Sequence, residues 1–133
     1  MSSVRPRVSV IIPCFNQACY LGEAIESALA QRGPSLEIVV VDDGSSDATR
    51  SVAERFREVR YIHQDNRGTA AARNRGLRSS GGEFIVFLDA DDRFLPGAVE
   101  IGVRRLDVHP DCGFAYGFVN VIRPDGSLSS RPD

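Results

Sequence analysis

The sequence predicts an α/β domain built on an open, mostly parallel sheet with helices on both faces. Short apolar segments alternate along the chain with segments of helical periodicity, and the connections between them are short. Two of the apolar segments, residues 36–41 (LEIVVV) and 84–88 (FIVFL), are almost continuously apolar, which suits strands that are covered on both faces. This alternation favours right-handed crossovers between parallel strands.

Five strands are expected. They are short, apolar runs with many β-branched residues, and they lie at residues 7–12, 36–41, 59–63, 84–88 and within 113–122. The glycines of the last segment leave its boundaries undefined. We therefore expect residues 1–122 to form one domain and residues 123–133 to form a polar C-terminal tail.

Four helices are expected between the strands. Their apolar residues recur at a spacing of three or four, around residues 21–29, 52–56, 70–77 and 99–106. Ser45 or Ser46 is a candidate N-cap for the second helix, and Pro96 suits the first turn of the fourth. The pairs Gly33-Pro34 and His109-Pro110 mark the ends of the first and fourth helices.

Composition narrows the class of protein. The net charge is −2, from 16 basic and 18 acidic residues, which argues against a nucleic-acid partner held by bulk charge. No apolar run approaches the ~20 residues of a membrane span, and residues 1–7 lack a secretory signal, so we expect a cytoplasmic protein. The three cysteines form no CxxC pair, which argues against a disulfide framework or zinc site.

Three segments with unusual chemistry follow predicted strands. They are residues 13–17 (PCFNQ), 42–47 (DDGSSD) and 89–93 (DADDR). In open α/β sheets, ligands bind beyond the carboxyl ends of the strands. The sequence therefore predicts a binding site at which these three segments meet.

The third segment is a candidate metal site. Asp89 and Asp91 are two residues apart, so in extended chain their carboxylates project to the same side. Three carboxylates in four residues, including Asp92, repel each other unless a cation intervenes. A few carboxylates suit Mg²⁺ or Mn²⁺, with phosphate oxygens and water completing the coordination. The alternative is a solvated acidic turn after a buried strand.

The other two segments offer groups that suit a nucleotide. One of Asp42 and Asp43 is expected to support the turn at Gly44, and the other can accept a hydrogen bond from a base N–H. Phe15 offers either a stacking face or a core side chain. The chain contains neither a G-x-G-x-x-G run nor a Walker-type phosphate loop, which favours phosphate binding through the acidic cluster and a metal.

A basic segment, residues 66–78 (NRGTAAARNRGLR), carries four arginines. An arginine close to a helix start suits a diphosphate. Charged residues on a helix usually form a solvated face, so we expect at least two of the four to do so. They are Arg67, Arg73, Arg75 and Arg78.

Taken together, these segments resemble family 2 of the GT-A glycosyltransferases, which have a Rossmann-like fold. The matching segments are residues 8–31, 36–49, 66–77 and 81–100, about three quarters of the chain. The resemblance implies inverting transfer of a sugar from a nucleotide-diphosphate donor, commonly UDP-linked, to a carbohydrate or lipid-linked acceptor. It also implies a divalent metal.

The resemblance assigns roles to individual residues. Pro13 and Phe15 correspond to the base pocket, and Asp43 to the residue that binds the base, with Asp42 supporting it. Arg73 and Asn74 fall where the family closes over the nucleotide. Asp89 and Asp91 match the DxD motif, with Asp89 near the ribose or donor sugar and Asp91 as the metal ligand.

The family's general base lies well after the DxD motif, and no segment here matches it. We therefore expect the chain to be part of a larger enzyme, either soluble or attached to the cytoplasmic face of a membrane. The alternative is a module that binds a nucleotide sugar without catalysis. A nucleotidyltransferase is disfavoured, because residues 13–17 lack the glycine-rich basic loop of that class.

Overall fold

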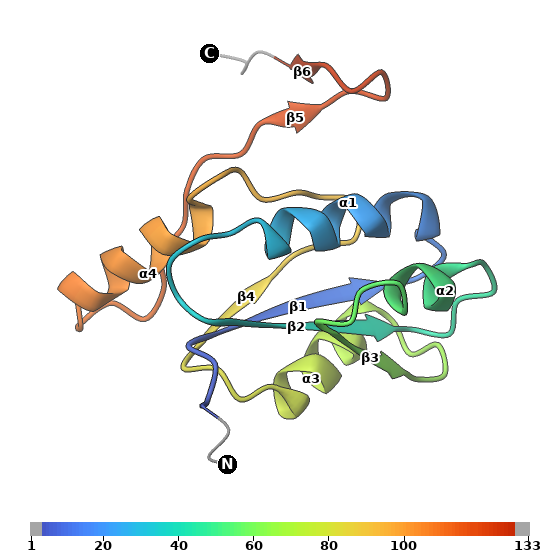
Figure 1. The fold of residues 1–133 in the computed structure, drawn as a ribbon, viewed down its shortest axis with the longest axis horizontal. Helices are drawn as coiled ribbons and strands as arrows, with labels where there is room; N and C mark the ends of the chain where they lie inside the picture. Colours follow the sequence, from blue (N-terminus) through green and yellow to red (C-terminus); the bar gives the residue numbers. More distant parts are fainter. Residues whose placement is uncertain (1–3, 130–133) are drawn as a thin grey trace. The chain divides into compact units, whose positions relative to one another are not determined.

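A computed structural model describes residues 4–129 and confirms the open parallel sheet (Figure 1). The sheet has the order β3-β2-β1-β4, and all three pairings are parallel. Its strands are β1 (Val8–Cys14), β2 (Leu36–Asp42), β3 (Val59–His63) and β4 (Phe84–Phe87). All seven residues of the strand β1 are buried, which agrees with a sequence in which only Ser9 is polar.

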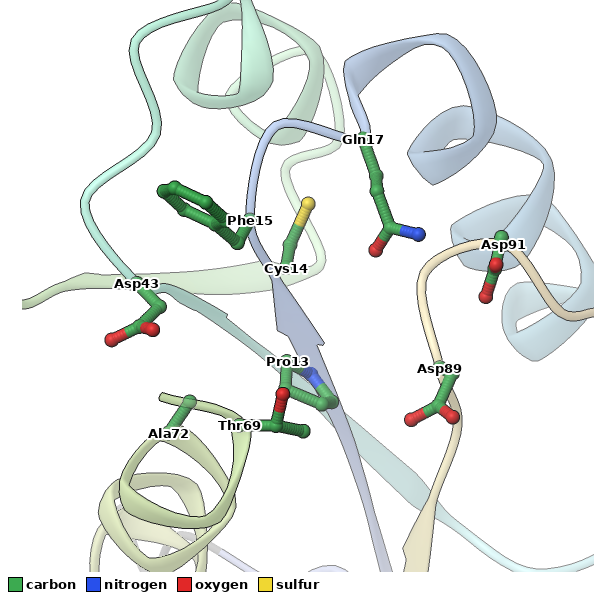
Figure 2. Close-up of a pocket in the computed structure, with 9 residues that line it drawn as sticks. All are labelled: Pro13, Cys14, Phe15, Gln17, Asp43, Thr69, Ala72, Asp89 and Asp91. Carbon is green, nitrogen blue, oxygen red and sulfur yellow. The ribbon is translucent and has the colours of Figure 1, made fainter. Parts of the chain in front are cut away.

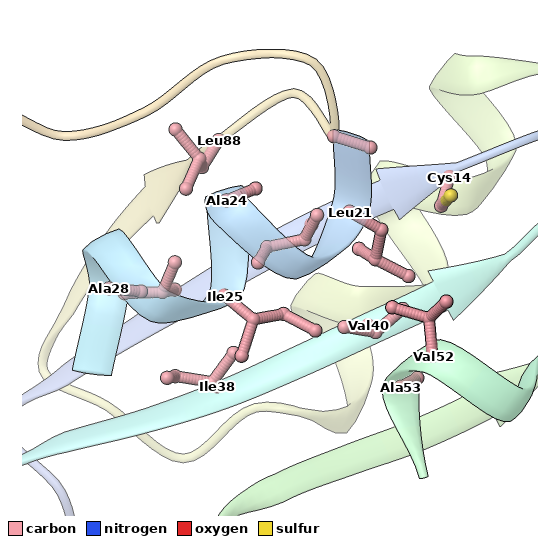
Figure 3. Packing of buried hydrophobic residues seen from close by; sticks show 13 residues of the cluster. Cys14, Leu21, Ala24, Ile25, Ala28, Ile38, Val40, Val52, Ala53 and Leu88 are labelled. Carbon is pink, nitrogen blue, oxygen red and sulfur yellow. The ribbon is translucent and has the colours of Figure 1, made fainter. Parts of the chain in front are cut away.

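Helices cover both faces of the sheet, as predicted (Figure 1). Helices α1 (Ala18–Leu29) and α2 (Thr49–Ala53) lie on one face and α3 (Thr69–Ser79) on the other, and α4 (Ala98–Val108) follows β4 in the chain. On one face, residues of β1 and β2 pack with α1 and α2 in a cluster that includes Val10, Leu21 and Ile25 (Figure 3). On the other face, Ile11 and Val39 pack with α3 through Ala72. The alternation of side chains along β1 therefore supplies two cores.

The start of α2 differs from the prediction. The helix begins at Thr49, so neither Ser45 nor Ser46 caps it. The N-cap position is held by Ala48, and the residue before it, Asp47, accepts a hydrogen bond from the Thr49 amide through its Oδ1 at 3.0 Å. The two serines bind Asn16 instead. The backbone amide of Asn16 donates to Ser45 Oγ, and the backbone amide of Ser46 donates to Asn16 Oδ1. The turns after β1 and β2 are thereby joined.

The chain divides into two compact units, residues 1–101 and 102–133. In the second unit, β5 (Val121–Ile122) pairs antiparallel with β6 (Leu128–Ser129). The expected fifth strand is thus reduced to two residues within 113–122, and it belongs to a two-stranded sheet of its own. Glycines at 113 and 117 interrupt the apolar run, which weakens its strand propensity. Of the expected polar tail, residues 130–133 lie outside the described residues.

Within residues 4–129, no helix has the length and hydropathy that a bilayer crossing requires.

Candidate functional site

The carboxyl ends of β1, β2 and β4 border a cleft of about 340 Å³ (Figure 2). The three polar segments that the sequence singles out meet here, as expected for parallel strands with a common edge. Helix α3 closes the remaining side. The lining residues are Pro13, Cys14, Phe15, Gln17, Asp43, Thr69, Ala72, Asp89 and Asp91.

Asp43, just beyond the end of β2, is almost fully buried, with 3% of its surface exposed. Its Oδ1 accepts hydrogen bonds from Gln64 Nε2 at 2.7 Å and from the Arg67 amide at 2.8 Å, and its Oδ2 accepts one from the Gly68 amide at 2.9 Å. Burial opposes ionisation, but these three donors outweigh it and lower the pKa of Asp43. A buried, ionised carboxylate therefore faces the cleft.

Asp42 is buried but is not among the lining residues. Its Oδ1 accepts a hydrogen bond from the Ser45 amide at 2.8 Å, and its Oδ2 accepts one from the Tyr61 hydroxyl at 2.6 Å. Burial, together with this bond to Asp42, raises the pKa of Tyr61. Asp42 thus fixes the turn that presents Asp43, in which Gly44 adopts a φ of +81°.

The end of β1 supplies a wall of the cleft. Phe15 is 47% exposed, so the alternative of a core phenylalanine is wrong. Its ring offers an apolar face near Asp43 (Figure 2). Cys14 has a buried thiol 3.8 Å from Thr49 Oγ1, and burial raises the pKa of this thiol. Pro13 also lines the cleft and is buried.

The two aspartates of the DxD motif differ in their contacts. Arg73 Nη2 lies 2.8 Å from Asp89 Oδ1, and the Arg73 guanidinium stacks over the Phe87 ring at 5.8 Å. Asp91 is exposed, and among the described residues no hydrogen bond or ion pair engages its carboxylate. Burial, and then the charges of Asp91 and Asp89, raise the pKa of Asp92, which does not line the cleft. Asp91 is therefore the carboxylate left available to a ligand.

The two carboxylates of the DxD motif, Asp89 and Asp91, can hold a divalent cation only if the ligand adds further oxygens. Within the part of the chain that the structure describes, no group of three or more potential metal ligands is present. Oxygen donors from one or two carboxylates suit Mg²⁺ or Mn²⁺, which keep water and bind substrate phosphates as well. The residues present fit such a shared metal and do not form a protein-only cage.

The side chains of the two predicted residues Arg73 and Asn74 lie on different faces of helix α3. Arg73 is half-buried and reaches Asp89, and its Nε is buried without a hydrogen-bond partner. Asn74 is exposed and does not line the cleft, because one helical residue corresponds to a rotation of about 100°. The other three arginines of the segment are exposed, as expected for a solvated face.

Four residues that line the cleft were not predicted as site residues from the sequence: Cys14, Gln17, Thr69 and Ala72. Cys14 and Gln17 fall inside the 13–17 segment, so their position at a strand end was the available clue. Thr69 and Ala72 come from the first turn of α3. Their role depends on how the helix packs across the sheet, which no local pattern reveals.

Comparison with known proteins identifies relatives of this fold and site. The family model described as glycosyl transferase family 2 matches residues 9–131. A Campylobacter jejuni protein named GalNAc(5)-diNAcBac-PP-undecaprenol beta-1,3-glucosyltransferase is 37% identical over 133 residues, covering 95% of this chain and 42% of the relative. A putative teichuronic acid biosynthesis glycosyltransferase of Bacillus subtilis is 31% identical, covering 96% of this chain and 52% of the relative.

Solved structures agree with this result. S. aureus TarS 1-349 in complex with UDP-GlcNAc has a TM-score of 0.73 and 31% identity, covering 78% of this chain and 32% of that protein. The mannosyltransferase PcManGT from Pyrobaculum calidifontis, in complex with GDP-Man and Mn2+, has a TM-score of 0.63 and 37% identity. The match covers 69% of this chain and 29% of that protein. The chain spans 17–52% of the length of its curated relatives. A GT-A type sheet, a cleft at its carboxyl edge and a family match over most of the chain agree: this chain belongs to glycosyl transferase family 2.

Proposed function

We propose that the cleft binds the nucleotide-diphosphate part of a UDP-linked sugar donor, with Mg²⁺ or Mn²⁺. In the complete enzyme, the sugar would pass to an acceptor hydroxyl with inversion at the anomeric carbon. The observation that carries the proposal is the convergence of Phe15, Asp43 and Asp91 on one cleft. An aromatic face and a buried carboxylate suit the base, and an acidic edge suits the metal-bound diphosphate.

The hydrogen bonds of Asp43 favour uracil over guanine. A carboxylate oxygen accepts about two hydrogen bonds. Two donors already fill Asp43 Oδ1, whereas Oδ2 has one donor and keeps one acceptor position. Uracil offers a single ring N–H, but guanine offers an amino group in addition to its ring N–H. The remaining acceptor position therefore matches uracil.

At the other end of the cleft, Asp91 would hold the metal. The metal, when bound, offsets the charge that develops on the departing diphosphate. Arg73 contacts Asp89 at 2.8 Å, and the Asp89 carboxylate points toward the cleft (Figure 2). This arrangement supports the assignment of Asp89 to the ribose or donor sugar.

Similar structures support a nucleotide-sugar donor but differ in the nucleotide, since TarS holds UDP-GlcNAc and PcManGT holds GDP-Man. The longer curated relatives include an enzyme named for an undecaprenol-linked glycan. We therefore propose a carbohydrate or lipid-linked acceptor for the complete enzyme. We assign the general base to none of Asp107, Asp111 and Asp125, because none of them is among the residues that line the cleft.

Calorimetric titration of the chain with UDP, with and without Mn²⁺, tests the proposal, with GDP as the comparison. We expect Mn²⁺-dependent binding that prefers UDP. Asp43→Asn should weaken UDP binding in both conditions by roughly tenfold or more, because a hydrogen bond to a charged group contributes about 1.5–3 kcal/mol. Asp91→Asn should remove the Mn²⁺ effect alone.

Asp111→Asn is the matched control, because Asp111 is exposed and lies outside the cleft. A preference for GDP would contradict the assignment of Asp43 to uracil. A full Mn²⁺ effect in Asp91→Asn would contradict its role as metal ligand. Absence of binding by a folded sample would refute the site itself.

A further inference from the structure

A second cleft, of about 350 Å³, lies on the outer side of α3 and shares no lining residue with the donor cleft. Its volume lies within the range of about 300–1,000 Å³ that is usual for small-molecule sites. It is lined by His63, Gln64, Asp65, Arg67, Ala71, Arg75 and Arg78.

The cleft follows from the geometry of α3. Ala71, Arg75 and Arg78 are separated by four and three residues, so they share one face of the helix. Ala72 and Gly76, on the adjacent face, are buried against the sheet. The short side chain of Ala71 leaves space between Arg75 and the segment that follows β3. Two arginines of the helix thus face the same space as Arg67.

The charges in this cleft are unbalanced. Three guanidinium groups line it, against a single carboxylate, that of Asp65. Across residues 4–129, no ion pair or hydrogen bond engages the guanidinium of Arg67, Arg75 or Arg78. Other arginines of the chain do pair with acids: Arg50 with Glu54, Arg73 with Asp89 and Arg93 with Glu23. Three guanidinium groups without an ion-pair partner therefore share one cleft, although the chain has more acids than bases.

The wall that carries Arg67 is held firmly. The Gln64 amide donates to the Asp42 carbonyl at 2.9 Å, and the Gln64 side chain and the Arg67 amide both donate to Asp43. A Cβ on Gly44 would lie 2.9 Å from the Asn66 amide nitrogen, so the two turns are in close contact. Arg67 therefore extends from a fixed backbone, which lowers the entropic cost of binding a ligand.

We propose that this cleft binds a phosphate-bearing anion, best a diphosphate group. Guanidinium groups bind phosphate oxygens through paired, charge-assisted hydrogen bonds, and three of them around one space match a group with several anionic oxygens. The same chemistry is offered by free diphosphate and by the headgroup of an anionic lipid. The site is separate from the donor cleft, so the proposal does not rest on donor binding.

Titration of the ¹⁵N-labelled chain with inorganic diphosphate, in metal-free buffer and followed by amide resonances, tests the proposal. We expect shifts in residues 63–68 and 71–78. The double variant Arg75→Gln/Arg78→Gln should bind diphosphate at least about tenfold more weakly, since each lost charged contact contributes more than a neutral one. Glutamine retains helix propensity, and both positions are exposed, so the variant is expected to fold.

Arg55→Gln/Arg57→Gln is the control, because it removes the same charge at exposed positions outside the cleft. Co-sedimentation with phosphatidylcholine vesicles, with and without phosphatidylglycerol, identifies the source of the phosphate. Vesicle binding that requires phosphatidylglycerol, Arg75 and Arg78 would support a lipid headgroup, and diphosphate binding alone would support a free ligand. Equal losses in the two double variants, or no binding of either probe, would overturn the proposal. Neither readout involves UDP, so failure of the donor proposal is distinguishable.

Discussion

The substitution Gly76→Ala probes how α3 is seated on the sheet. Gly76 is buried, and a Cβ at this position would lie 2.3 Å from Ile11 Cγ2 and 3.2 Å from Val41 Cγ2. Ordinary carbon contacts are about 3.5–4.0 Å, so the added methyl requires a displacement of more than 1 Å. Ile11 is completely buried in β1, so its displacement would disturb the packing around it.

Two opposing terms set the magnitude. Overpacking a dense core costs about 1–3 kcal/mol, and a contact of 2.3 Å to a buried side chain belongs at the upper end of that range. Alanine is favoured over glycine in a helix by about 1 kcal/mol. We therefore expect Gly76→Ala to lower the free energy of unfolding by about 2 kcal/mol.

Urea denaturation followed by circular dichroism measures this change. Gly102→Ala is the matched control, because Gly102 lies inside α4 and a Cβ there meets no atom within 4 Å. That variant should be unchanged or stabilised by up to about 1 kcal/mol. Ile11→Leu removes the β-branched methyl group, so in that background Gly76→Ala should cost less than it does alone.

The outcome also bears on the site, since α3 carries Thr69 and Ala72 of the cleft and the Arg73 partner of Asp89. A displaced α3 should weaken UDP binding as well as stability. If Gly76→Ala were as stable as the parent, or if its cost were the same in the Ile11→Leu background, the close approach of α3 to β1 would not be the cause.

Two further predictions concern the acids that follow β2. Because hydrogen bonding lowers the pKa of Asp43 in the folded state, its contribution to stability is present above the unfolded pKa of about 4 and is lost as pH falls through the lower folded value. Urea midpoints measured from pH 7 to pH 3 should therefore fall less in Asp43→Asn than in the parent, and parallel profiles would contradict this. Asp47→Ala should lower the free energy of unfolding by about 1 kcal/mol, because Asp47 accepts hydrogen bonds from the Ala18 and Thr49 amides. Asp111→Ala is its exposed control, and an equal effect of the two would refute a stabilising role for the Asp47 hydrogen bonds.

The sheet was readable from the sequence because burial on both faces leaves a simple pattern. The runs in β1 and β2 contain almost only apolar residues. They could therefore be assigned as buried strands without knowing which helix covers each face. The order of the strands was not readable, since parallel strands of similar composition can exchange places without altering the pattern. The prediction of a longer fifth strand was wrong because residues 113–120 contain glycines at 113 and 117, and no neighbouring strand pairs with them.

The site was predictable where chemistry is local and hidden where it depends on packing. Asp43, Asp89 and Asp91 follow strands directly, so the edge of the sheet brings them together. Ala72 has no functional group. It lines the cleft because α3 packs on the sheet close to the carboxyl ends of the strands. The N-cap of α2 was misassigned because Ser45 and Ser46 are good capping residues whose side chain and amide are used by Asn16 from another turn.

The donor cleft combines a fixed half with an adaptable half. At the end of β2, both carboxylate oxygens of Asp43 accept hydrogen bonds from the protein, so the base would meet an acceptor that is already oriented. At the end of β4, Asp91 is exposed and has no such partner within the described residues. An unpaired carboxylate near Asp92 and Asp89 gains most from a ligand that brings positive charge. Selectivity for the nucleotide would therefore reside at β2 and exist before binding, whereas the phosphate end is completed only by the metal and the diphosphate together.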